Sequence, residues 1–526
     1  MSRQKKMQRM FPVSPSRFMK RFLSFFKPSK PLLSAFVLGA MMVFAHAPVA
    51  IAPLAVIALA GLFWLWFKAG SKKETTQIGL WFGLGFFGVG VSWLISSMYI
   101  YADVNLVLAI LATFIFILFL SLYFMLAGWL VGLLKSADKV AFSWVLVMPA
   151  VWVFAEWLRA TLFGGFPFLM TGNTHLLTWL DGYAPVFGVL GVSWAVAMTA
   201  GILLWLYQVR AWIGASFLLA VLWLTGAALK NVQWVEPEGK PVKVALLQGN
   251  VKQDQKWDRA HFIPTLKTYV SLTKQNLDAD LIVWPETAVP AYYDTVENGV
   301  LRSFIKDTQL LETDVLMGVI TRNRQTGEYF NALVNARNPE QVYHKKHLVP
   351  FSEYFPFSKI LKTLSLMFDI PFSEFTHGAP DQEPLALGKH KVGVSVCYEM
   401  AFGEELADSA KTSSYLVTVS NDAWFAHTFE PAQQVQDVQM RAIELGREIA
   451  RTTNTGYTVI VGTDGQIKQE IPPYETGVLR GEVQPYTGTT PFVEWKQLPL
   501  LLLLSVVMSF LAARKIALLP LVQAKK

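Results

Sequence analysis

The sequence contains eight apolar stretches, most of them long enough to cross a lipid bilayer as helices. Crossing about 30 Å of hydrocarbon takes roughly 20 helical residues. The stretches lie near residues 31–47, 49–67, 78–100, 104–134, 140–159, 184–208, 212–229 and 497–513. Only Pro48 separates the first two, which are short, so they form either a hairpin or one interrupted helix. We therefore expect an α-helical membrane bundle of about eight spans.

The charged residues divide the chain into three parts. Residues 1–230 hold 17 Lys/Arg and 5 Asp/Glu, residues 231–495 hold 24 and 33, and residues 496–526 hold five and none. We expect these parts to be an N-terminal bundle of about seven helices, a polar domain, and a C-terminal helix with its tail. Because the excess positive charge flanks apolar runs, it is typical of membrane orientation, and a nucleic-acid partner is not expected.

The positive charges also predict how the chain is oriented in the membrane. Nine Lys/Arg and no acid precede the first span, and the nearly uncharged loops at 99–103 and 161–183 alternate with basic ones. The basic loops carry Lys68, Lys72, Lys73, Lys135, Lys139 and Arg210. Since basic loops stay in the cytoplasm, both termini are expected there and residues 231–495 on the opposite side.

The polar part of the chain alternates between strand and helix patterns. Helical patterns lie near 259–277, 299–311 and 432–450. Apolar, β-branched runs lie at 242–247, 281–284, 315–320, 332–334, 391–396 and 415–419. This alternation favours a layered α/β domain.

Three polar side chains follow predicted strands directly. Glu286 comes after the run at 281–284, Lys345 follows a short strand, and Cys397, the single cysteine, closes the run at 391–396. Sheets of α/β proteins place their chemistry at such strand ends. Taken alone, each residue is also compatible with a surface charge or a buried thiol.

Together the three groups suit acyl transfer. A nearby ammonium and helix N-terminus favour a thiolate, and a carboxylate within reach can take the thiol proton. When the sulfur attacks a carbonyl carbon, the lysine can stabilise the charge that develops on the oxygen.

The strings at residues 282–287, 343–353 and 396–399 resemble the Glu-Lys-Cys motifs of the nitrilase superfamily. Joined to a membrane bundle, they resemble the apolipoprotein N-acyltransferase family of the bacterial inner membrane. Strings at 248–250, 256–258, 420–425 and 440–442 extend the resemblance. Where the family commonly has glycine after Phe425, this chain has Ala426.

The resemblance implies a four-layer α-β-β-α domain in the periplasm. It implies transfer of a fatty acyl chain from a phospholipid to the α-amine of the diacylglyceryl-cysteine of an apolipoprotein, by ping-pong through a thioester. Cys397 would be the nucleophile, Glu286 the general base and Lys345 the oxyanion stabiliser. The supporting residues would be Glu353, Glu399 and Tyr398.

Two tryptophans and two loops are candidates for lipid contact. Trp257 and Trp424 line the acyl pocket or belong to the core. The aromatic-rich loops at 350–357 and 361–375 either cover the site and enter the outer leaflet or pack against the protein. In the bundle, Glu156 and Arg159 share a helix face, which favours a mutual salt bridge over headgroup binding.

No cofactor or metal is expected. The sequence has neither a phosphate-binding loop of the GxxxxGK type nor an HExxH motif, and ordinary polar roles are favoured for His344 and His347. Two alternatives stay open, a membrane-tethered nitrilase-type amidase and a transporter with a periplasmic sensor domain. The second is disfavoured because five acids in the first 230 residues offer little for a polar pathway.

Overall fold

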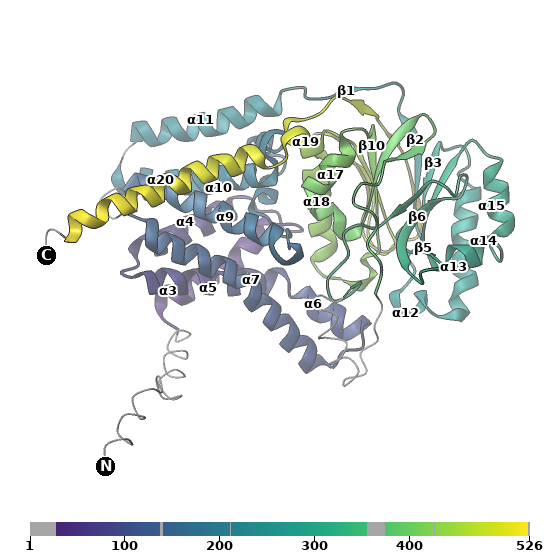
Figure 1. The fold of residues 1–526 in the computed structure, drawn as a ribbon, viewed down its shortest axis with the longest axis horizontal. Helices are drawn as coiled ribbons and strands as arrows, with labels where there is room; N and C mark the ends of the chain where they lie inside the picture. Colours follow the sequence, from purple (N-terminus) through teal and green to yellow (C-terminus); the bar gives the residue numbers. More distant parts are fainter. Residues whose placement is uncertain (1–27, 137–139, 211, 355–373, 426, 524–526) are drawn as a thin grey trace, which may run out of the picture.

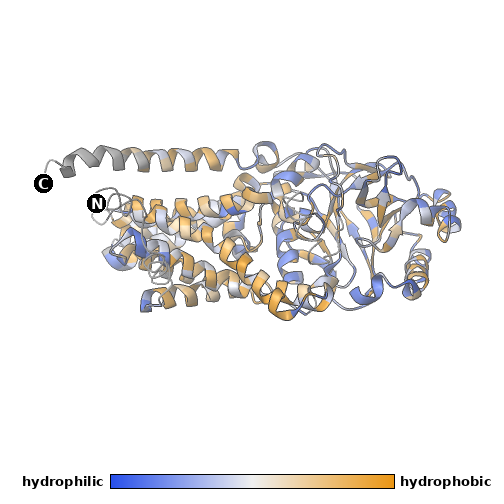
Figure 2. Cartoon of the chain, turned by 60° about the horizontal axis from the view of Figure 1, so that its bottom comes forward, coloured by the Kyte–Doolittle hydropathy of each residue, from blue (hydrophilic) through white to orange (hydrophobic). Residues whose placement is uncertain are grey.

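The computed structural model describes residues 28–523 except 137–139, 211, 355–373 and 426. Its helical bundle and its α/β domain lie side by side (Figure 1). Hydrophobic residues dominate the helical half (Figure 2). The main elements of the bundle are α3 (Lys30–Met42), α4 (Pro53–Lys68), α5 (Lys72–Gly90), α6 (Trp93–Ser96), η2 (Ser97–Tyr101), α7 (Leu106–Leu134), α9 (Met148–Thr161), η5 (Thr171–His175), η6 (Trp179–Tyr183), α10 (Ala184–Val209), α11 (Trp212–Lys230) and α20 (Leu498–Gln523).

Several apolar helices can cross a membrane, but the predicted count of eight is not confirmed. By length and hydropathy, four helices among the described residues qualify: Leu106–Leu134, Val140–Gly164, Trp179–Gln208 and Trp212–Lys230. A fifth span results if Lys72–Gly90 and Trp93–Tyr101, which meet at 47°, are counted together. The other three predicted stretches form shorter apolar helices, Lys30–Ala45, Pro53–Lys68 and Leu498–Leu511. The first two are separate helices that pack together.

Glycines let the bundle helices approach closely. A Cβ atom on Gly79 of α5 would collide with the Phe124 carbonyl of α7, and one on Gly128 of α7 would collide with the Thr75 carbonyl of α5. Without side chains at these positions, the two backbones pack directly, as small residues allow in membrane helices.

The α/β domain contains two large sheets. Its principal helices are α12 (Gln253–Lys256), α13 (Arg259–Lys274), α14 (Tyr293–Glu297), α15 (Arg302–Gln309), α17 (Gly403–Ala410), α18 (Glu430–Leu445) and α19 (Pro491–Trp495). One sheet has the order β14-β2-β3-β5-β6-β7, with β4 beside β5, and the other β13-β12-β11-β10-β9-β8. The first sheet is built from β2 (Val242–Gln248), β3 (Leu281–Val283), β4 (Val289–Tyr292), β5 (Asp314–Arg322), β6 (Tyr329–Asn335), β7 (Val342–His344) and β14 (Gly477–Val483). The second is built from β8 (Leu385–Leu387), β9 (His390–Val396), β10 (Tyr415–Ser420), β11 (Ile449–Thr453), β12 (Thr458–Val461) and β13 (Ile467–Ile471).

The two sheets pack face to face, and helices cover both outer faces. In β2, Val244 and Leu246 join the core between the sheets, whereas Ala245 and Leu247 face the helices of the first outer layer. On the other side, Leu416 of β10 packs with apolar residues of α17 and α18. This alternation, which has the period of a strand, produces the expected α-β-β-α layers.

The predicted strands and the three predicted helices are confirmed in place, but each helix ends earlier than predicted and α15 also begins later. The helix expected at 432–450 ends at Leu445, because Gly446 adopts a left-handed conformation with φ of 61° and β11 begins at Ile449. Glycine tolerates this conformation without a steric penalty and commonly ends helices in this way.

Helix α18 joins the domain to the bundle. The Asn173 amide donates to Asp437 at 2.6 Å, and the Gln436 amide donates to the Asn173 carbonyl at 2.9 Å. The Val189 N–H donates to Glu444 at 2.5 Å. Buried polar contacts of this kind fix one relative orientation, because each must be satisfied.

Candidate active site

Glu286, Lys345 and Cys397 meet at the carboxyl ends of strands from both sheets. Glu286 follows β3, Lys345 follows β7 and Cys397 follows β9. Strands β2, β3 and β5 are parallel, β7 runs in the same direction as β5, and β9 is parallel to β10. The prediction that these residues lie at strand ends is therefore confirmed.

Both oxygens of Glu286 are held. Its Oε1 accepts a hydrogen bond from Asn331 Nδ2 at 2.7 Å, and its Oε2 accepts one from the Asn421 backbone N–H at 2.9 Å. Lys345 Nζ lies 3.6 Å from Oε1. These contacts fix the direction in which the carboxylate points, which a base must have before it can take a proton.

Lys345 is buried and forms a close ion pair with Glu353. Its Nζ lies 2.8 Å from Glu353 Oε2, and its side chain is 1% exposed. Burial alone would lower the pKa of Lys345, but Glu353 and Glu286 outweigh it and raise the pKa above its usual value. Lys345 is therefore a permanent cation that cannot act as a base at neutral pH.

Cys397 has an unusual backbone and a neutral thiol. Its φ of 55° lies in the left-handed region, where a non-glycine residue is strained. Burial and the neighbouring Glu286 raise the pKa of the thiol, and Lys345 only partly opposes them. The expectation that its surroundings favour a resting thiolate is therefore wrong, because desolvation and a carboxylate outweigh one ammonium.

Glu399 links the end of β9 to the backbone of the Lys345 loop. Its carboxylate accepts hydrogen bonds from the backbone N–H groups of Val396 at 2.6 Å, Lys346 at 2.6 Å and His347 at 3.0 Å, and from the Tyr343 hydroxyl at 3.0 Å. It thus holds the backbone beside Lys345, whereas the ammonium itself contacts Glu353.

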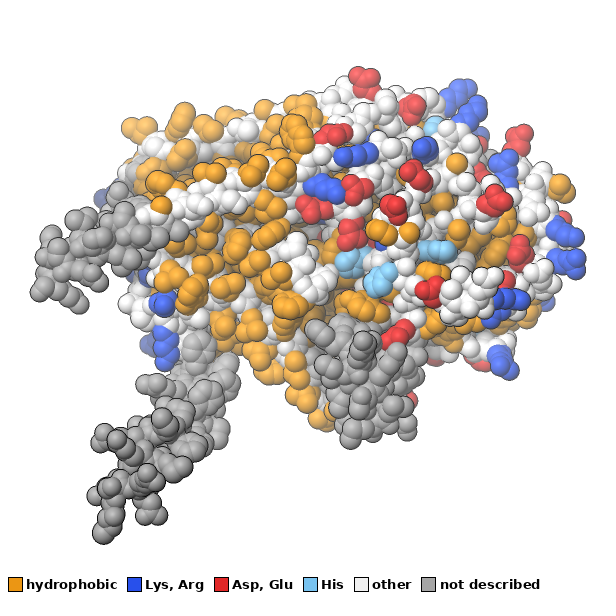
Figure 3. Space-filling model, in the orientation of Figure 1, with side chains coloured by type: hydrophobic (Ala, Val, Ile, Leu, Met, Phe, Trp, Pro, Cys, Tyr) orange, Lys and Arg blue, Asp and Glu red, His pale blue; other side chains and the backbone are white. Residues whose placement is uncertain are grey.

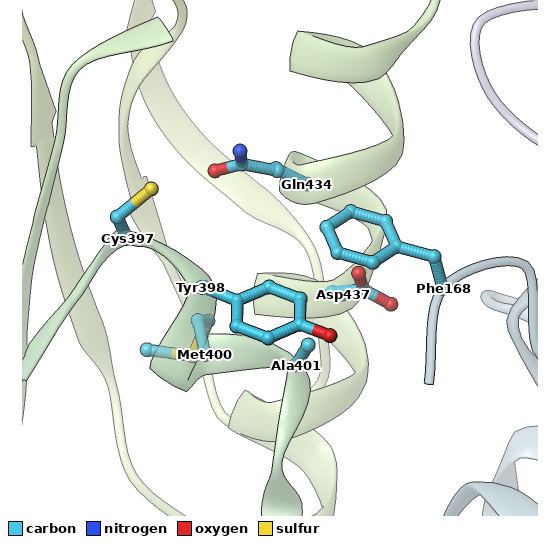
Figure 4. A pocket seen from close by; sticks show the side chains of 7 residues that line it. All are labelled: Phe168, Cys397, Tyr398, Met400, Ala401, Gln434 and Asp437. Atoms are coloured by element: carbon cyan, nitrogen blue, oxygen red, sulfur yellow. The ribbon is translucent and has the colours of Figure 1, made fainter. Parts of the chain in front are cut away.

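Tyr398 connects the site to the bundle. Its hydroxyl donates to the Gly165 carbonyl at 2.9 Å, and its ring stacks on Phe168 with centroids 5.8 Å apart. Phe168, Cys397 and Tyr398 line a small cavity together with Met400 and Ala401, which follow Tyr398, and with Gln434 and Asp437 of α18 (Figure 4).

The two candidate tryptophans lie in different environments. Trp257 is 56% exposed, so it is not a core residue. Trp424 is half-buried, and its ring meets Tyr101 of η2 edge-on at 6.4 Å. The neighbouring Phe425 meets Trp93 of α6 at 5.0 Å.

Part of the candidate aromatic loops lies outside the described residues, namely 355–373, as does Ala426. Of the described part, Phe351 is 64% exposed, Tyr354 meets His377 edge-on, and Phe375 meets Tyr329.

The two histidines beside Lys345 have polar partners. His344 Nε2 lies 3.0 Å from Thr321 Oγ1, and His347 Nδ1 lies 2.8 Å from Glu405 Oε1. In the described part of the chain, no group of three or more His, Cys, Asp or Glu is placed to hold a metal ion.

Glu156 and Arg159 stabilise one loop instead of forming the expected mutual salt bridge. Arg159 Nη1 donates to the carbonyls of Phe166 at 2.6 Å and Phe168 at 2.5 Å, and Glu156 accepts from Thr171 N–H at 2.8 Å. The loop at 162–171 that they hold carries the contacts of Tyr398.

Three residues that contact Glu286 were not predicted from the sequence. These are Asn331, Asn421 and Lys256, whose Nζ donates to the Glu286 carbonyl at 3.1 Å. Lys256 and Asn421 lie within the sequence strings that carry the family resemblance, and this resemblance could have identified them as site residues. Asn331 lies inside β6, and only the pairing with β5 brings it to the site.

Comparisons with known proteins match both halves of the chain. The model of the apolipoprotein N-acyltransferase N-terminal domain matches residues 38–202, and the carbon–nitrogen hydrolase model matches residues 243–492. Among relatives, the apolipoprotein N-acyltransferase of Methylococcus capsulatus is 40% identical over 92% of this chain and 96% of its own length. That of Nitrosomonas europaea is 37% identical over 88% and 93%, respectively. A solved carbon–nitrogen hydrolase from Helicobacter pylori is 18% identical over 46% of this chain and 89% of that one, with a TM-score of 0.35.

Proposed function

Because the chain belongs to the apolipoprotein N-acyltransferase family, we propose that Glu286, Lys345 and Cys397 carry out its acyl transfer in two steps through a thioester. The chain is an acyltransferase of the carbon–nitrogen hydrolase superfamily that acts in lipoprotein N-acylation. The donor is a phospholipid, and the acceptor is the α-amine of the diacylglyceryl-cysteine of an apolipoprotein. The observation that carries the proposal is the convergence of a fixed carboxylate, a paired ammonium and a strained cysteine beside the membrane bundle.

In the first step, Cys397 takes the acyl chain. Its thiol gives its proton to Glu286 as the sulfur attacks the ester carbonyl carbon and a C–S bond forms. Lys345 stabilises the oxyanion of the tetrahedral intermediate, because its charge is fixed in a desolvated site. The ester C–O bond then breaks, Glu286 returns its proton to the departing alcohol oxygen, and a lysophospholipid leaves.

In the second step, the acyl chain moves to the acceptor. The neutral α-amine attacks the thioester carbon, and its proton passes to Glu286 and then to the departing sulfur. The new C–N bond completes the amide, and the thiol is restored. Because the substrates react in turn, two lipids never need to occupy the site together.

Neighbouring residues orient these groups. Glu353 fixes Lys345 through their ion pair, and Glu399 fixes the loop after Lys345 through backbone N–H groups. Tyr398, next to Cys397, fixes the position of the nucleophile through its hydrogen bond to the bundle loop at 162–171. Trp424, which contacts η2, and the exposed Trp257 contact the incoming lipid.

We propose that the catalytic domain faces the periplasm and both termini the cytoplasm of a bacterial inner membrane. Three lysines lie at helix ends remote from α18: Lys68 ends α4, Lys72 begins α5, and Lys135 follows α7 and donates to the Ala69 carbonyl. Charged side chains otherwise gather over the domain, while the bundle surface is apolar (Figure 3). The positive-inside rule assigns the lysine-bearing end to the cytoplasm.

The proposal is tested by looking for the thioester. Purified protein incubated with phospholipid and no acceptor should gain one fatty-acyl group on Cys397, measured by intact mass. Neutral hydroxylamine should remove the group, and so should a diacylated lipopeptide with a free α-amine. Cys397→Ala should gain none.

Two results would contradict the proposal. If folded, active protein never acquires a phospholipid-derived adduct, the site is that of a tethered amidase that hydrolyses its intermediate. If the adduct persists in Cys397→Ala, the nucleophile is another residue.

A further inference from the structure

A second lysine, Lys256, contacts Glu286. Lys256 follows β2 and Lys345 follows β7, and these strands lie on opposite sides of β3, which leads to Glu286. Lys256 ends the short helix α12, which follows β2, and only 6% of its surface is exposed. Its Nζ donates to the backbone carbonyl of Glu286 at 3.1 Å. Lysine side chains normally extend their charge into water, so a buried ammonium directed at a backbone carbonyl needs a physical reason.

Helix α12 is connected to Glu286 by two routes. Besides the Lys256 contact, Gln253 Oε1 accepts from Asn421 Nδ2 at 2.9 Å, and the Asn421 N–H donates to Glu286 Oε2 at 2.9 Å. The helix therefore contacts the main chain of Glu286 directly and its carboxylate through Asn421. A displacement of Lys256 would therefore change the position of the Glu286 carboxylate.

Lys256 adds a second buried ammonium beside Glu286. Lys345 Nζ forms its close ion pair with Glu353 and lies farther, at 3.6 Å, from the carboxylate of Glu286. Burial lowers the pKa of Lys256 to about 8, and the attraction of Glu286 keeps it from falling further.

We propose that Lys256 is a positioning residue of acyl transfer, which holds the Glu286 main chain and whose ammonium stabilises the negative charge that passes from Glu286 to the Cys397 sulfur. The inference rests on the proposed roles of Glu286 and Cys397. When the thiol proton moves to Glu286, one negative charge moves to the sulfur and then to the carbonyl oxygen. With Lys256 charged, a second ammonium lies beside Glu286 while the negative charge moves; without it, only Lys345, which already pairs with Glu353, opposes that charge, and the anion is harder to form.

The inference predicts the alkaline side of the pH profile. The protonated form of Lys256 is the active one, so acylation should decline as the pH rises through about 8. Arginine stays charged at any accessible pH, so Lys256→Arg should move the decline to higher pH. The other titratable groups near Lys256 are Glu286 after β3 and Cys397 after β9, then Lys345 and Glu353 through Glu286, with Asp254 exposed on α12 itself.

The test measures the rate of acyl-enzyme formation on Cys397 from pH 6 to 10, by intact mass, in the full chain with phosphatidylethanolamine vesicles. Lys256→Met should slow acylation by about tenfold or more, on the scale of lost electrostatic stabilisation. It should also abolish the decline near pH 8 and leave the donor concentration for half-maximal rate unchanged. Lys252→Met, which changes an exposed lysine just before the same helix, should behave as wild type.

Three results would overturn the inference. The first is a wild-type rate that does not decline between pH 7 and 10, a result that needs no variant and stands even if Lys256→Met fails to fold. The second is that Lys256→Met slows acylation but keeps the decline, because the lysine would then have only a structural role. The third is that Lys256→Met leaves both the rate and the pH profile unchanged. Wild-type protein that never acquires an adduct on Cys397 would instead overturn the proposed function, and the inference with it.

Discussion

The thiol of Cys397 lies between charges of opposite sign, and their balance decides how it reacts. Burial and Glu286 raise the pKa of the thiol, while Lys345 lowers it. The thiol is therefore neutral at rest and loses its proton only when Glu286 accepts it. We therefore expect the thiol to resist alkylation and oxidation between turnovers, because the thiolate is the reactive form.

Substitutions of the two charged partners should separate their roles. Glu286→Gln keeps the shape of the side chain but removes the base, and Lys345→Met removes the cation. Each should slow acyl-enzyme formation by about 10²–10³, the cost of one positioned oxyanion donor in other enzymes. Lys346→Ala, at the half-buried neighbouring position, should be mild. Intact-mass kinetics measure all three.

The same variants should shift the thiol pKa in opposite directions. Removing the negative charge of Glu286 should lower it, and removing the ammonium of Lys345 should raise it further, as the pH dependence of iodoacetamide labelling would report. If Lys346 proved essential and Lys345 dispensable, the assigned positions on this loop would be wrong by one residue.

Sequence alone indicated the three central residues because each directly follows an apolar strand. It could not indicate Asn331, because that residue reaches Glu286 only through the antiparallel pairing of β5 and β6, in which Ile320 faces Asn331. Asn421 contacts Glu286 through its backbone N–H, a contact that no side-chain pattern reveals. The thiol state depends on burial, which is likewise a property of the packed molecule.

At the scale of elements, the loop between α9 and η5 connects bundle and active site. Arg159 donates to the carbonyls of Phe166 and Phe168, and the Tyr398 hydroxyl donates to the Gly165 carbonyl in the same loop. The spacing of Glu156 and Arg159 showed that they share a face but not that the loop returns to bind both. The number of spans also depends on where helices bend and end, and hydropathy does not show this for α5 and α6.

Arg159→Met should destabilise the protein and slow acyl transfer together. It removes the donor from the buried Phe168 carbonyl and from the partly buried Phe166 carbonyl, and the loss at a buried carbonyl costs about 1–3 kcal/mol. The apparent melting temperature in detergent micelles should fall by several degrees. Arg324→Met removes an exposed ion pair with Asp294, for which about 0–1 kcal/mol is typical, and serves as the control. Equal melting temperatures for the two variants would show that the loop does not depend on Arg159.

At the scale of the whole molecule, α18 belongs to both halves. Its Asp437 accepts from Asn173 and its Glu444 accepts from the Val189 N–H, both in the bundle, while Gln434 and Asp437 line the cavity beside Cys397. The packing of the domain on the bundle therefore also fixes the wall of the active site. Sequence predicted a helix here but not which face meets the membrane part.

This interface should make the whole protein less stable as the pH rises. Burial raises the pKa of Asp437 to about 7 and that of Glu444 to about 7, although Arg441 opposes it in both cases. Their unfolded values lie near 4, so between about pH 4 and 7 the native state binds more protons than the unfolded state. The stabilisation is fully present below about pH 4 and is lost as the pH rises through 7.

The melting temperature should fall between pH 5 and 8, and Asp437→Asn combined with Glu444→Gln should flatten this dependence because neither amide titrates. Asp408→Asn, which removes an exposed carboxylate from α17, should keep the wild-type slope. Parallel slopes for wild type and the double variant would mean that the two carboxylates are ionised in the folded protein, and that α18 is held to the bundle by charged contacts instead of neutral ones.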